Sequence, residues 1–509
     1  MKKIPLTFFC LISFSLFLKA QEVELPSFIT DSLESYINKG LEEWRIPGLA
    51  VGIAKDGKLI YAKGFGVKSI DGSETVDENT LFMIGSNTKS FTAMSLAILA
   101  ESGQLSLEDK VQKWMPEFGL RDTLTSRELN LTDLLSHRIG FETYQGDFTC
   151  WNSNLTRAQV IEKMGLLEAP HSFRTRWGYC NAAFVTAGEL IPRIIGRSWE
   201  ETVKDSILNP LKMNQTMMLD YEFRNAPNIA MPHSIVNGEI SIIPITNMNS
   251  LAPAGSMASN VPNLLKWLDC LMNDGNINSE QILPARAVRS LKTPASILRL
   301  DPGDNQFTHF YLYGLGLMIN DRDGTLVYSH GGAVDGFLTQ MMLIPELQLG
   351  IVVLTNSDQN NFYNDLTNEI RDAFLGIPFK NHSSNSLARF EDRRQRDQLR
   401  IDSLRLVVQE SNNPTLQLNA YSGNYSNEVY GTIDISRRQN QLMITFSNHP
   451  NLTATLEHLK KDTFLCTYSN STFGVEEIPF EIDNNEVLGL SLKVADFIEY
   501  GRYEFRKTK

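Results

Sequence analysis

The stretch Gly85-Ser86-Asn87-Thr88-Lys89, followed by FTAMSLAILA at residues 91–100, decides the fold and points to the chemistry. The second segment is apolar on most sides of a helix, and Gly103 after it favours a helix end. We therefore predict a buried helix that begins at Ser86. A helix N-terminus favours negative charge, and a capping box would place Glu or Gln where Lys89 stands. The lysine is at the end of the helix that suits a cation least.

Burial and the helix dipole both predict a lowered pKa for Lys89, which leaves a neutral amine one turn from the hydroxyl of Ser86. Such a pair is a nucleophile beside its base. An isolated S-x-x-K pattern is more often an ordinary N-cap serine followed by a lysine that reaches solvent. Further motifs are needed before the pair indicates catalysis.

Composition narrows the classes of protein that this chain can be. With 509 residues, 42% of them hydrophobic and 21% charged, we expect two or three globular units. The net charge of −12 disfavours nucleic acid as a partner. The eight histidines show no zinc-binding spacing, so no metal is expected, and no cofactor is expected either. Apart from Cys10 near the start of the sequence, four scattered cysteines argue against a disulfide framework and leave room for one isolated bridge: Cys150, Cys180, Cys270 and Cys466.

The first residues, MKKIPLTFFCLISFSLFLKAQ, are typical of a cleaved secretory signal peptide over residues 1–20. They contain two lysines, an apolar stretch too short to cross a bilayer, and the small residue Ala20 before a polar segment. No later segment is long and apolar enough to span a membrane. We expect an exported protein, either periplasmic or secreted.

Strand-like apolar runs lie in two groups separated by helix-rich sequence. Residues 49–54 and 58–62 are joined through Asp56-Gly57, a strong hairpin signal. The second group of strands is expected at residues 316–319, 325–328, 340–344 and 350–354, and the helices between the groups at residues 86–102, 181–191, 199–207 and 261–272. This order predicts an α+β fold, in which an antiparallel sheet closed by both ends of one domain is flanked by helices and packs against an all-helical lobe.

The remaining sequence divides into two further parts. Residues 379–414 include FEDRRQRDQLRIDSLRLVVQE and predict a charged helical linker. Residues 415–507 contain short alternating strands and turns, typical of a small all-β barrel or sandwich. The first and largest domain is expected over residues 28–378.

Two more motifs are polar and close to predicted element ends. Tyr179-Cys180-Asn181 opens a helix, and His330-Gly331-Gly332-Ala333 follows a strand. Taken alone, the tyrosine is more often a packing residue and the paired glycines a bulge or a tight turn. No G-x-S-x-G elbow is present, which disfavours an α/β-hydrolase.

In this order and spacing, S-x-x-K, Y-x-N and a strand with H-G-G resemble the serine β-lactamase and penicillin-binding-protein superfamily. The resemblance is to class C β-lactamases, D-Ala-D-Ala carboxypeptidase B-type peptidases and related esterases. It covers about residues 28–378 and includes Ile46-Pro47-Gly48, LTDLLSHRIGF around His137 and LAPAGSMASNVPNLLKW ending at Trp267. It implies a β-lactamase-like catalytic domain. Residues 415–507 resemble the lipocalin-like β domain appended to some relatives, in which it can cap the cleft or support oligomers.

The resemblance also implies roles for individual residues. Ser86 would attack a carbonyl, Lys89 and Tyr179 would share general-base and general-acid duty, and Asn181 would orient the substrate amide. The backbone amides of Ser86 and Ala333, beside Gly332, would form the oxyanion hole. His330 stands where many relatives have lysine, which weakens the expectation of β-lactam hydrolysis because a neutral imidazole binds a carboxylate less well. Cys180 replaces a common serine and is expected to be a small buried thiol.

These expectations give one leading hypothesis and one alternative. The leading hypothesis is an exported serine hydrolase that cleaves an amide or ester in a small molecule or peptide through a Ser86 acyl-enzyme, of the D-amino-acid peptidase, esterase or weak β-lactamase type. The alternative is a penicillin-binding-like ligand-recognition protein with little or no turnover. The sequence does not identify the substrate, because pocket loops decide it.

Overall fold

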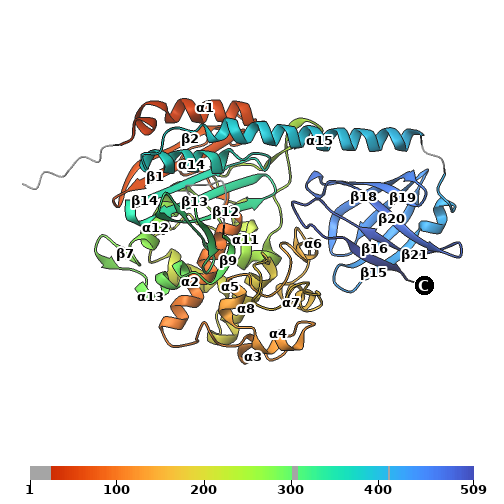
Figure 1. Ribbon diagram of the computed structural model, residues 1–509, viewed down its shortest axis with the longest axis horizontal. Coiled ribbons are helices and arrows are strands. Elements are labelled where there is room, and N and C mark those ends of the chain that lie inside the picture. The colour runs from red at the N-terminus through yellow and green to blue at the C-terminus, as the bar shows by residue number, and fades with distance from the viewer. Residues whose placement is uncertain (1–24, 301–307, 411–412, 509) are drawn as a thin grey trace, which may run out of the picture.

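Residues 25–300, 308–410 and 413–508 are described by the computed structural model, in which one long helix joins two folded parts (Figure 1). The signal peptide expected over residues 1–20 lies outside these ranges. Within them, none of the helices combines the length and apolar character that a membrane crossing needs. The four cysteines in these ranges are buried free thiols.

The hairpin predicted at Asp56-Gly57 forms one edge of an eight-stranded antiparallel sheet. Both turn residues have positive φ, 53° and 71°, as the tight turn requires. The strand order is β2 (Lys58–Gly66), β1 (Gly48–Lys55), β14 (Leu349–Thr355), β13 (Phe337–Ile344), β12 (Thr325–Val334), β11 (Met318–Arg322), β10 (Phe310–Tyr313) and β9 (Ser296–Leu300). Because β1 pairs with β14, both ends of the domain close the sheet, which confirms the predicted fold class.

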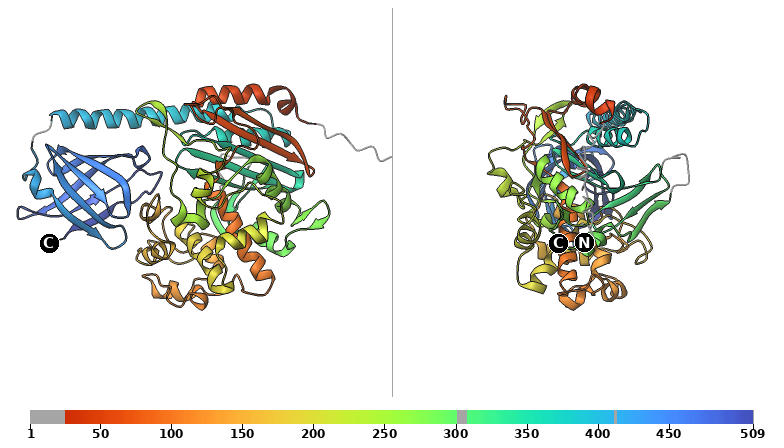
Figure 2. Two further views of the ribbon diagram at one scale, coloured as in Figure 1. Left: turned by 180° about the vertical axis from the view of Figure 1, so that it is seen from behind. Right: turned by 90° about the vertical axis from the view of Figure 1, so that its left-hand side faces the viewer.

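Both faces of this sheet are covered by helices (Figure 2). Helix α12 (Val261–Met272) packs on one face, and α1 (Leu33–Trp44) and α14 (Phe362–Phe374) belong to the apolar cluster on the other. Alternate residues of β1 point to opposite faces of the sheet. Val51 and Ile53 pack with α1 and α14, whereas Ala50 belongs to the apolar cluster that contains α12. This double burial explains why the strand reads as a continuous apolar run.

Helix α2 (Thr88–Glu101) runs through the centre of the helical lobe. It is preceded by a short 3₁₀ turn, Gly85–Asn87, so the α-helix begins two residues after the predicted start at Ser86. The other helices of this domain are α3 (Val111–Trp114), α4 (Thr123–Glu128), α5 (Leu131–Leu135), α6 (Asp147–Cys150), α7 (Arg157–Gly165), α8 (Asn181–Ile195), α9 (Trp199–Val203), α10 (Asp220–Arg224), α11 (Ala252–Gly255) and α13 (Ala285–Lys292).

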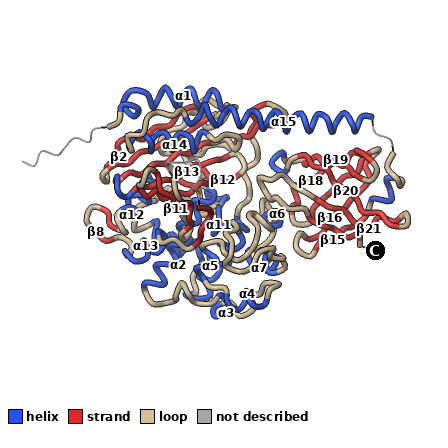
Figure 3. Tube along the Cα trace, viewed as in Figure 1, coloured by secondary structure: helices blue, strands red, loops and turns tan. Residues whose placement is uncertain are grey.

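The C-terminal part is a closed eight-stranded barrel (Figure 3). Its interior is filled by side chains, among them the mutually packed rings of Tyr421, Phe464 and Phe480. The strands are β15 (Gly423–Asn427), β16 (Gly431–Arg438), β17 (Gln441–Phe446), β18 (His449–Lys460), β19 (Thr463–Tyr468), β20 (Val475–Asp483), β21 (Glu486–Leu492) and β22 (Tyr503–Lys507).

Helix α15 (His382–Glu410) connects the two parts and is mostly exposed. It begins at His382, in the polar sequence NHSSNS that precedes the charged run starting at Phe390, and the reason lies in two buried serines. Trp44 Nε1 donates a hydrogen bond to Ser383 Oγ at 2.9 Å, and Ser386 Oγ donates to Asp365. The polar first turn is thereby fastened to the larger domain.

Candidate active site

Ser86 occupies the one position between residues 81 and 97 whose side chain is not buried. The residue before it, Gly85, has φ = 51°, and this left-handed conformation turns the chain sharply into α2. The hydroxyl of Thr88 donates to the carbonyl oxygen of Gly85 at 2.7 Å and closes the turn. A short strand followed by this turn therefore presents Ser86 at the start of an otherwise buried helix.

Lys89 is completely buried and its Nζ atom has three oxygen partners. Nζ lies 3.0 Å from Ser86 Oγ, 2.6 Å from Asn181 Oδ1 and 2.9 Å from the carbonyl oxygen of Ala254. Burial lowers the pKa of Lys89 from 10.5 to about 7, while the charge of Asp147 acts in the opposite direction. A neutral amine here can donate its two hydrogens to Asn181 and Ala254, which leaves its lone pair directed at the Ser86 hydroxyl.

Tyr179 is the second titratable group at Ser86, to which its side chain is hydrogen-bonded. Its ring also lies over Lys89, with Nζ 4.7 Å from the ring centroid. Burial, together with the neighbouring Tyr313, raises the pKa of the Tyr179 phenol well above its ordinary value. The phenol is therefore protonated near neutral pH and can donate a proton.

Asn181, the first residue of α8, links Lys89 to a buried carboxyl group. Its Oδ1 accepts from Lys89, and its Nδ2 donates to Asp147 Oδ2 at 2.6 Å. This second bond fixes which end of the amide faces the lysine, since Nδ2 cannot accept. Burial and the nearby Glu499 raise the pKa of Asp147 well above the ordinary range.

His330 belongs to a chain of hydrogen bonds that keeps two histidines neutral. The amide of Cys180 donates to His137 Nδ1 at 3.1 Å, so the ring hydrogen of His137 is on Nε2, 3.3 Å from the Tyr313 hydroxyl. Tyr313 then donates to His330 Nε2 at 3.1 Å, and His330 Nδ1 donates to the carbonyl oxygen of Gly331 at 2.6 Å. Burial lowers the pKa of His330 to about 3.

Both ring nitrogens of His330 are thus engaged within the protein. The role toward a substrate carboxylate that the sequence suggested for this residue stays a prediction. In this structure the neutral ring ties β12 to β10 through Tyr313.

Strand β12 passes directly against the turn that carries Ser86. A Cβ atom on Gly332 would lie 1.9 Å from the carbonyl oxygen of Ile84, and one on Gly85 would lie 2.7 Å from the amide nitrogen of Ala333. Both positions therefore need glycine. The close approach brings the N–H of Ala333 to the residue that precedes Ser86, as an oxyanion hole with two backbone donors requires.

The structure brings Ser86, Lys89, Tyr179 and Asn181 into one hydrogen-bonded group, with Gly332 and Ala333 against the same turn. Three further participants are absent from the sequence-based set: Asp147, the carbonyl of Ala254 and Tyr313. Asp147 and Tyr313 belong to no motif that the sequence singled out, whereas Ala254 lies in the LAPAG segment, to which the resemblance gave no role. The tertiary structure therefore identifies the part that each of them plays.

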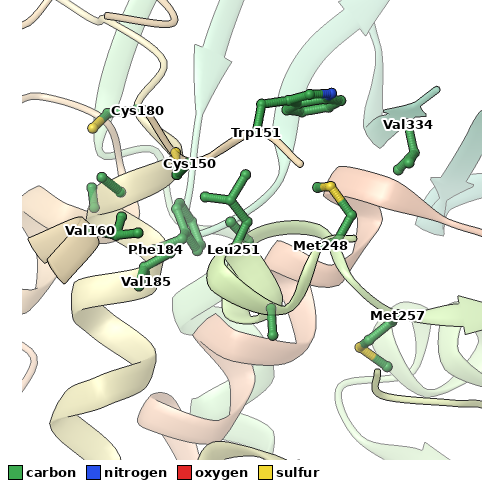
Figure 4. Close-up of a cluster of buried hydrophobic side chains, with 14 of the residues drawn as sticks. Cys150, Trp151, Val160, Cys180, Phe184, Val185, Met248, Leu251, Met257 and Val334 are labelled. Atoms are coloured by element: carbon green, nitrogen blue, oxygen red, sulfur yellow. The ribbon is translucent and has the colours of Figure 1, made fainter. Parts of the chain in front are cut away.

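Apolar packing holds the elements of the site in place (Figure 4). Phe184 and Val185 of α8 pack with Cys150 and Leu251 in the buried core. The centroid of the Phe184 ring also lies 5.4 Å from Lys89 Nζ. This dry surrounding is the source of the desolvation that lowers the lysine pKa. Among the described residues, no group of three or more His, Cys, Asp or Glu side chains could hold a metal ion.

The fold and this site define a class of protein. The family model described as Beta-lactamase matches residues 33–375, and the chain belongs to this family. It is a serine hydrolase of that family, and the resemblance drawn from the sequence motifs is confirmed. A second model, described as a domain of unknown function (DUF3471), matches residues 409–507, which include the barrel.

Individual relatives are distant and cover most of the chain. The unguisins hydrolase of Aspergillus violaceofuscus is 25% identical over 477 residues, which are 85% of this chain and 82% of the relative. The octameric penicillin-binding protein homologue from Pyrococcus abyssi is similar in fold, with a TM-score of 0.59, 22% identity, and coverage of 93% of this chain and 99% of that one. The D-stereospecific amidohydrolase from Streptomyces sp. has a TM-score of 0.55 and 23% identity, over 68% of this chain and 99% of its own.

Proposed function

We propose that this protein hydrolyses an amide or ester bond through an acyl-enzyme formed on Ser86. The observation that carries the proposal is the environment of Lys89 Nζ, which lies 3.0 Å from Ser86 Oγ while two other oxygens take its hydrogens. Such a lysine can accept the serine proton as the hydroxyl attacks a carbonyl carbon.

The proton then has a route to the leaving group. Tyr179 is bonded to Ser86 and remains a neutral phenol, so it suits proton donation to the departing amine or alcohol. Lys89 suits the general-base role because its pKa of about 7 lies near the operating pH. The amides of Ser86 and Ala333 would hold the negative charge that develops on the carbonyl oxygen. Water attacks the acyl-enzyme in the second half of the reaction, with the same groups in reverse.

For the substrate we propose a small amide, ester or peptide, with a D-residue on the acyl side as the first class to test. Two relatives are named as a D-stereospecific amidohydrolase and an unguisins hydrolase. His330 is uncharged, which favours weak β-lactam hydrolysis at most, because a carboxylate finds no permanent cation at that position. Efficient turnover of a cephalosporin would contradict this part of the proposal.

The test is rapid-mixing release of nitrophenol from a short-chain nitrophenyl ester. We expect repeated turnover, with or without an initial burst, that is lost in Ser86→Ala. Ser95→Ala is the matched control, since Ser95 lies buried on the same helix and donates only to the carbonyl of Phe91. Activity in Ser86→Ala would refute the proposal. A burst of one equivalent with no further release would favour the ligand-recognition protein.

We also propose that the protein is exported, periplasmic or secreted, and that any assembly forms through the barrel. The leader-like sequence at residues 1–20 supports export, and the octameric relative supports assembly. The choice of the barrel rests on the resemblance of residues 415–507 to an appended domain that can support oligomers. N-terminal sequencing of the protein recovered from cell fractions tests export. Light scattering after size exclusion, repeated on a variant with charged substitutions on the outer barrel surface, tests assembly.

A further inference from the structure

A buried carboxyl group of the C-terminal barrel domain lies close to the active site. Glu499 lies in the segment between β21 and β22 and is only 2% exposed. Its Oε1 accepts from the amide of Gly146 at 2.7 Å, and its Oε2 accepts from the amide of Phe148 at 3.1 Å. These two residues flank Asp147, which in turn is bonded to Asn181.

An aromatic side chain also fastens residues 146–148 at the open end of the barrel. Phe148 is 1% exposed, and its ring stacks on those of His449 and Tyr503, with ring centroids 4.8 Å and 5.5 Å apart. The rings of Tyr430, Phe446 and Phe473 surround it at 5.9 to 6.1 Å. Phe148 therefore closes this end of a barrel whose interior is already filled. These ring contacts fasten α6 to the barrel.

We propose that Glu499 is a positioning residue for the catalytic lysine: it holds the start of α6 so that Asp147 orients Asn181 against Lys89. The inference rests on the proposed function of the site and deepens it. The barrel then contributes to the geometry of the active site, although none of its described atoms is hydrogen-bonded to Lys89.

The hydrogen bonds also decide where charge resides in this chain of groups. Glu499 accepts from two amides and from the Tyr430 hydroxyl at 2.7 Å, whereas Asp147 receives the one amide hydrogen of Asn181. Two neighbouring buried carboxyls do not both ionise readily, and the one with more donors ionises first. Burial and the neighbouring Glu499 both favour the protonated form of Asp147, which withholds a negative charge from Lys89.

Other titratable groups face the two ends of this series of hydrogen-bonded side chains. Cys180, His137 and His330 lie near Lys89, and Tyr144 and Cys150 lie near Asp147. Burial keeps these groups neutral near pH 7, because it raises the pKa of the thiols and the phenol and lowers that of the histidines. Tyr179 against Lys89, and Tyr430 and Tyr503 beside Glu499, are phenols whose pKa is raised by burial, so they stay neutral as well. Among the groups described, Asp147 and Glu499 are therefore those whose charge can change the pKa of the lysine.

The experiment is the pH profile of kcat/KM for the nitrophenyl ester, measured on the full chain. In Glu499→Gln the anion that opposes ionisation of Asp147 is gone, so Asp147 can ionise and raise the pKa of Lys89. The acid limb of the profile, where kcat/KM falls as Lys89 is protonated, should therefore move up by about one pH unit. Activity should fall several-fold at pH 7 and return at pH 9. In Asp147→Asn the limb should stay or move down, and adding Glu499→Gln to that variant should change nothing further. Glu504→Gln, an exposed carboxylate in the same barrel, is the matched control.

A profile of Glu499→Gln that superimposes on the wild type would overturn the inference, as would an equal shift in the Asp147→Asn background. Where Glu499→Gln does not fold, as judged by thermal unfolding, Tyr430→Phe removes one donor to the same carboxylate and should shift the limb in the same direction by less. Activity that survives Ser86→Ala would overturn the proposed function and this inference together. An inactive Ser86→Ala beside an unshifted Glu499→Gln overturns the inference alone.

Discussion

The hydroxyl of Tyr313 donates to Nε2 of His330 across 3.1 Å and accepts from His137 on its other side. This one phenol satisfies two buried imidazoles and fixes the tautomer of each. Because the second nitrogen of each ring is also bonded to the backbone, the three side chains form a closed set. Because both histidines are neutral, neither places a positive charge beside Lys89, and this environment is built into the fold.

Removing the Tyr313 hydroxyl is expected to destabilise the protein. Tyr313→Phe would leave the Nε2 atoms of His137 and His330 buried without their partner, at a cost of about 2 kcal/mol or more in the free energy of unfolding. Urea unfolding followed by circular dichroism measures this. Tyr311→Phe, two residues away on the same strand and only partly buried, should change the free energy by less than about 0.5 kcal/mol. Equal effects of the two substitutions would contradict the closed set.

Gly332→Ala is expected to separate β12 from the nucleophile turn. The new Cβ atom would lie 1.9 Å from the carbonyl oxygen of Ile84, which is backbone and cannot swing aside. The displaced Ala333 amide would then serve the oxyanion poorly, and kcat should fall about a hundredfold. Steady-state hydrolysis of the nitrophenyl ester is the measurement.

The neighbouring glycine supplies the control for that substitution. A Cβ atom on Gly331 would lie 3.0 Å from Oε1 of Gln340, the mobile end of a flexible side chain. Gly331→Ala should therefore keep kcat within a few-fold of the wild type. A loss as large as that of Gly332→Ala would mean that the strand tolerates no side chain here for a reason other than contact with Ile84.

The general-base role of Lys89 predicts a specific pH dependence. The free amine is the active form and its pKa is about 7, so kcat/KM should be level above that pH and fall tenfold per unit below it. Lys89→Arg keeps a permanent charge, and its activity should drop at least about a hundredfold at every pH. Lys39→Arg, on an exposed surface, should match the wild type. A flat wild-type profile between pH 5 and 8 would argue against the lysine as base.

Helix periodicity predicts the part of the site whose partners lie close along the chain, and the family resemblance predicted the more distant residues. Ser86 and Lys89 are three residues apart, so helix periodicity alone places them together. The bonds from Lys89 to Ala254 and from Glu499 to Gly146 span 165 and 353 residues, and no local pattern encodes them. Tertiary packing creates these contacts, and the packing also supplies the burial on which the lysine pKa depends.

The same distinction explains what was predicted of the sheet. The hairpin at Asp56-Gly57 and strands β12 to β14 carry strong apolar runs and turn residues, and they are confirmed. Strands β9 and β10 at the opposite edge were missed, since SILRL and FYLY are short and lack a recognisable turn. Their importance comes from Tyr313, which reaches the site only because β10 pairs with β11.

Lys89 should also impose a pH-dependent cost on stability. Its pKa is about 7 in the folded protein against an ordinary 10.5, because burial disfavours the ammonium form. The native state therefore binds fewer protons than the unfolded chain between these values, so the lysine's contribution is complete above pH 10.5 and is lost as the pH falls to 7. Lys89→Met has no such proton. The free energy of unfolding of the variant relative to the wild type should be greatest at pH 7 and decline toward pH 10.5, by about 5 kcal/mol at most. Urea unfolding at pH 7, 8.5 and 10 tests this, with Lys39→Met as the exposed control, and a difference that stays constant with pH would show that the lysine is not desolvated in the folded protein.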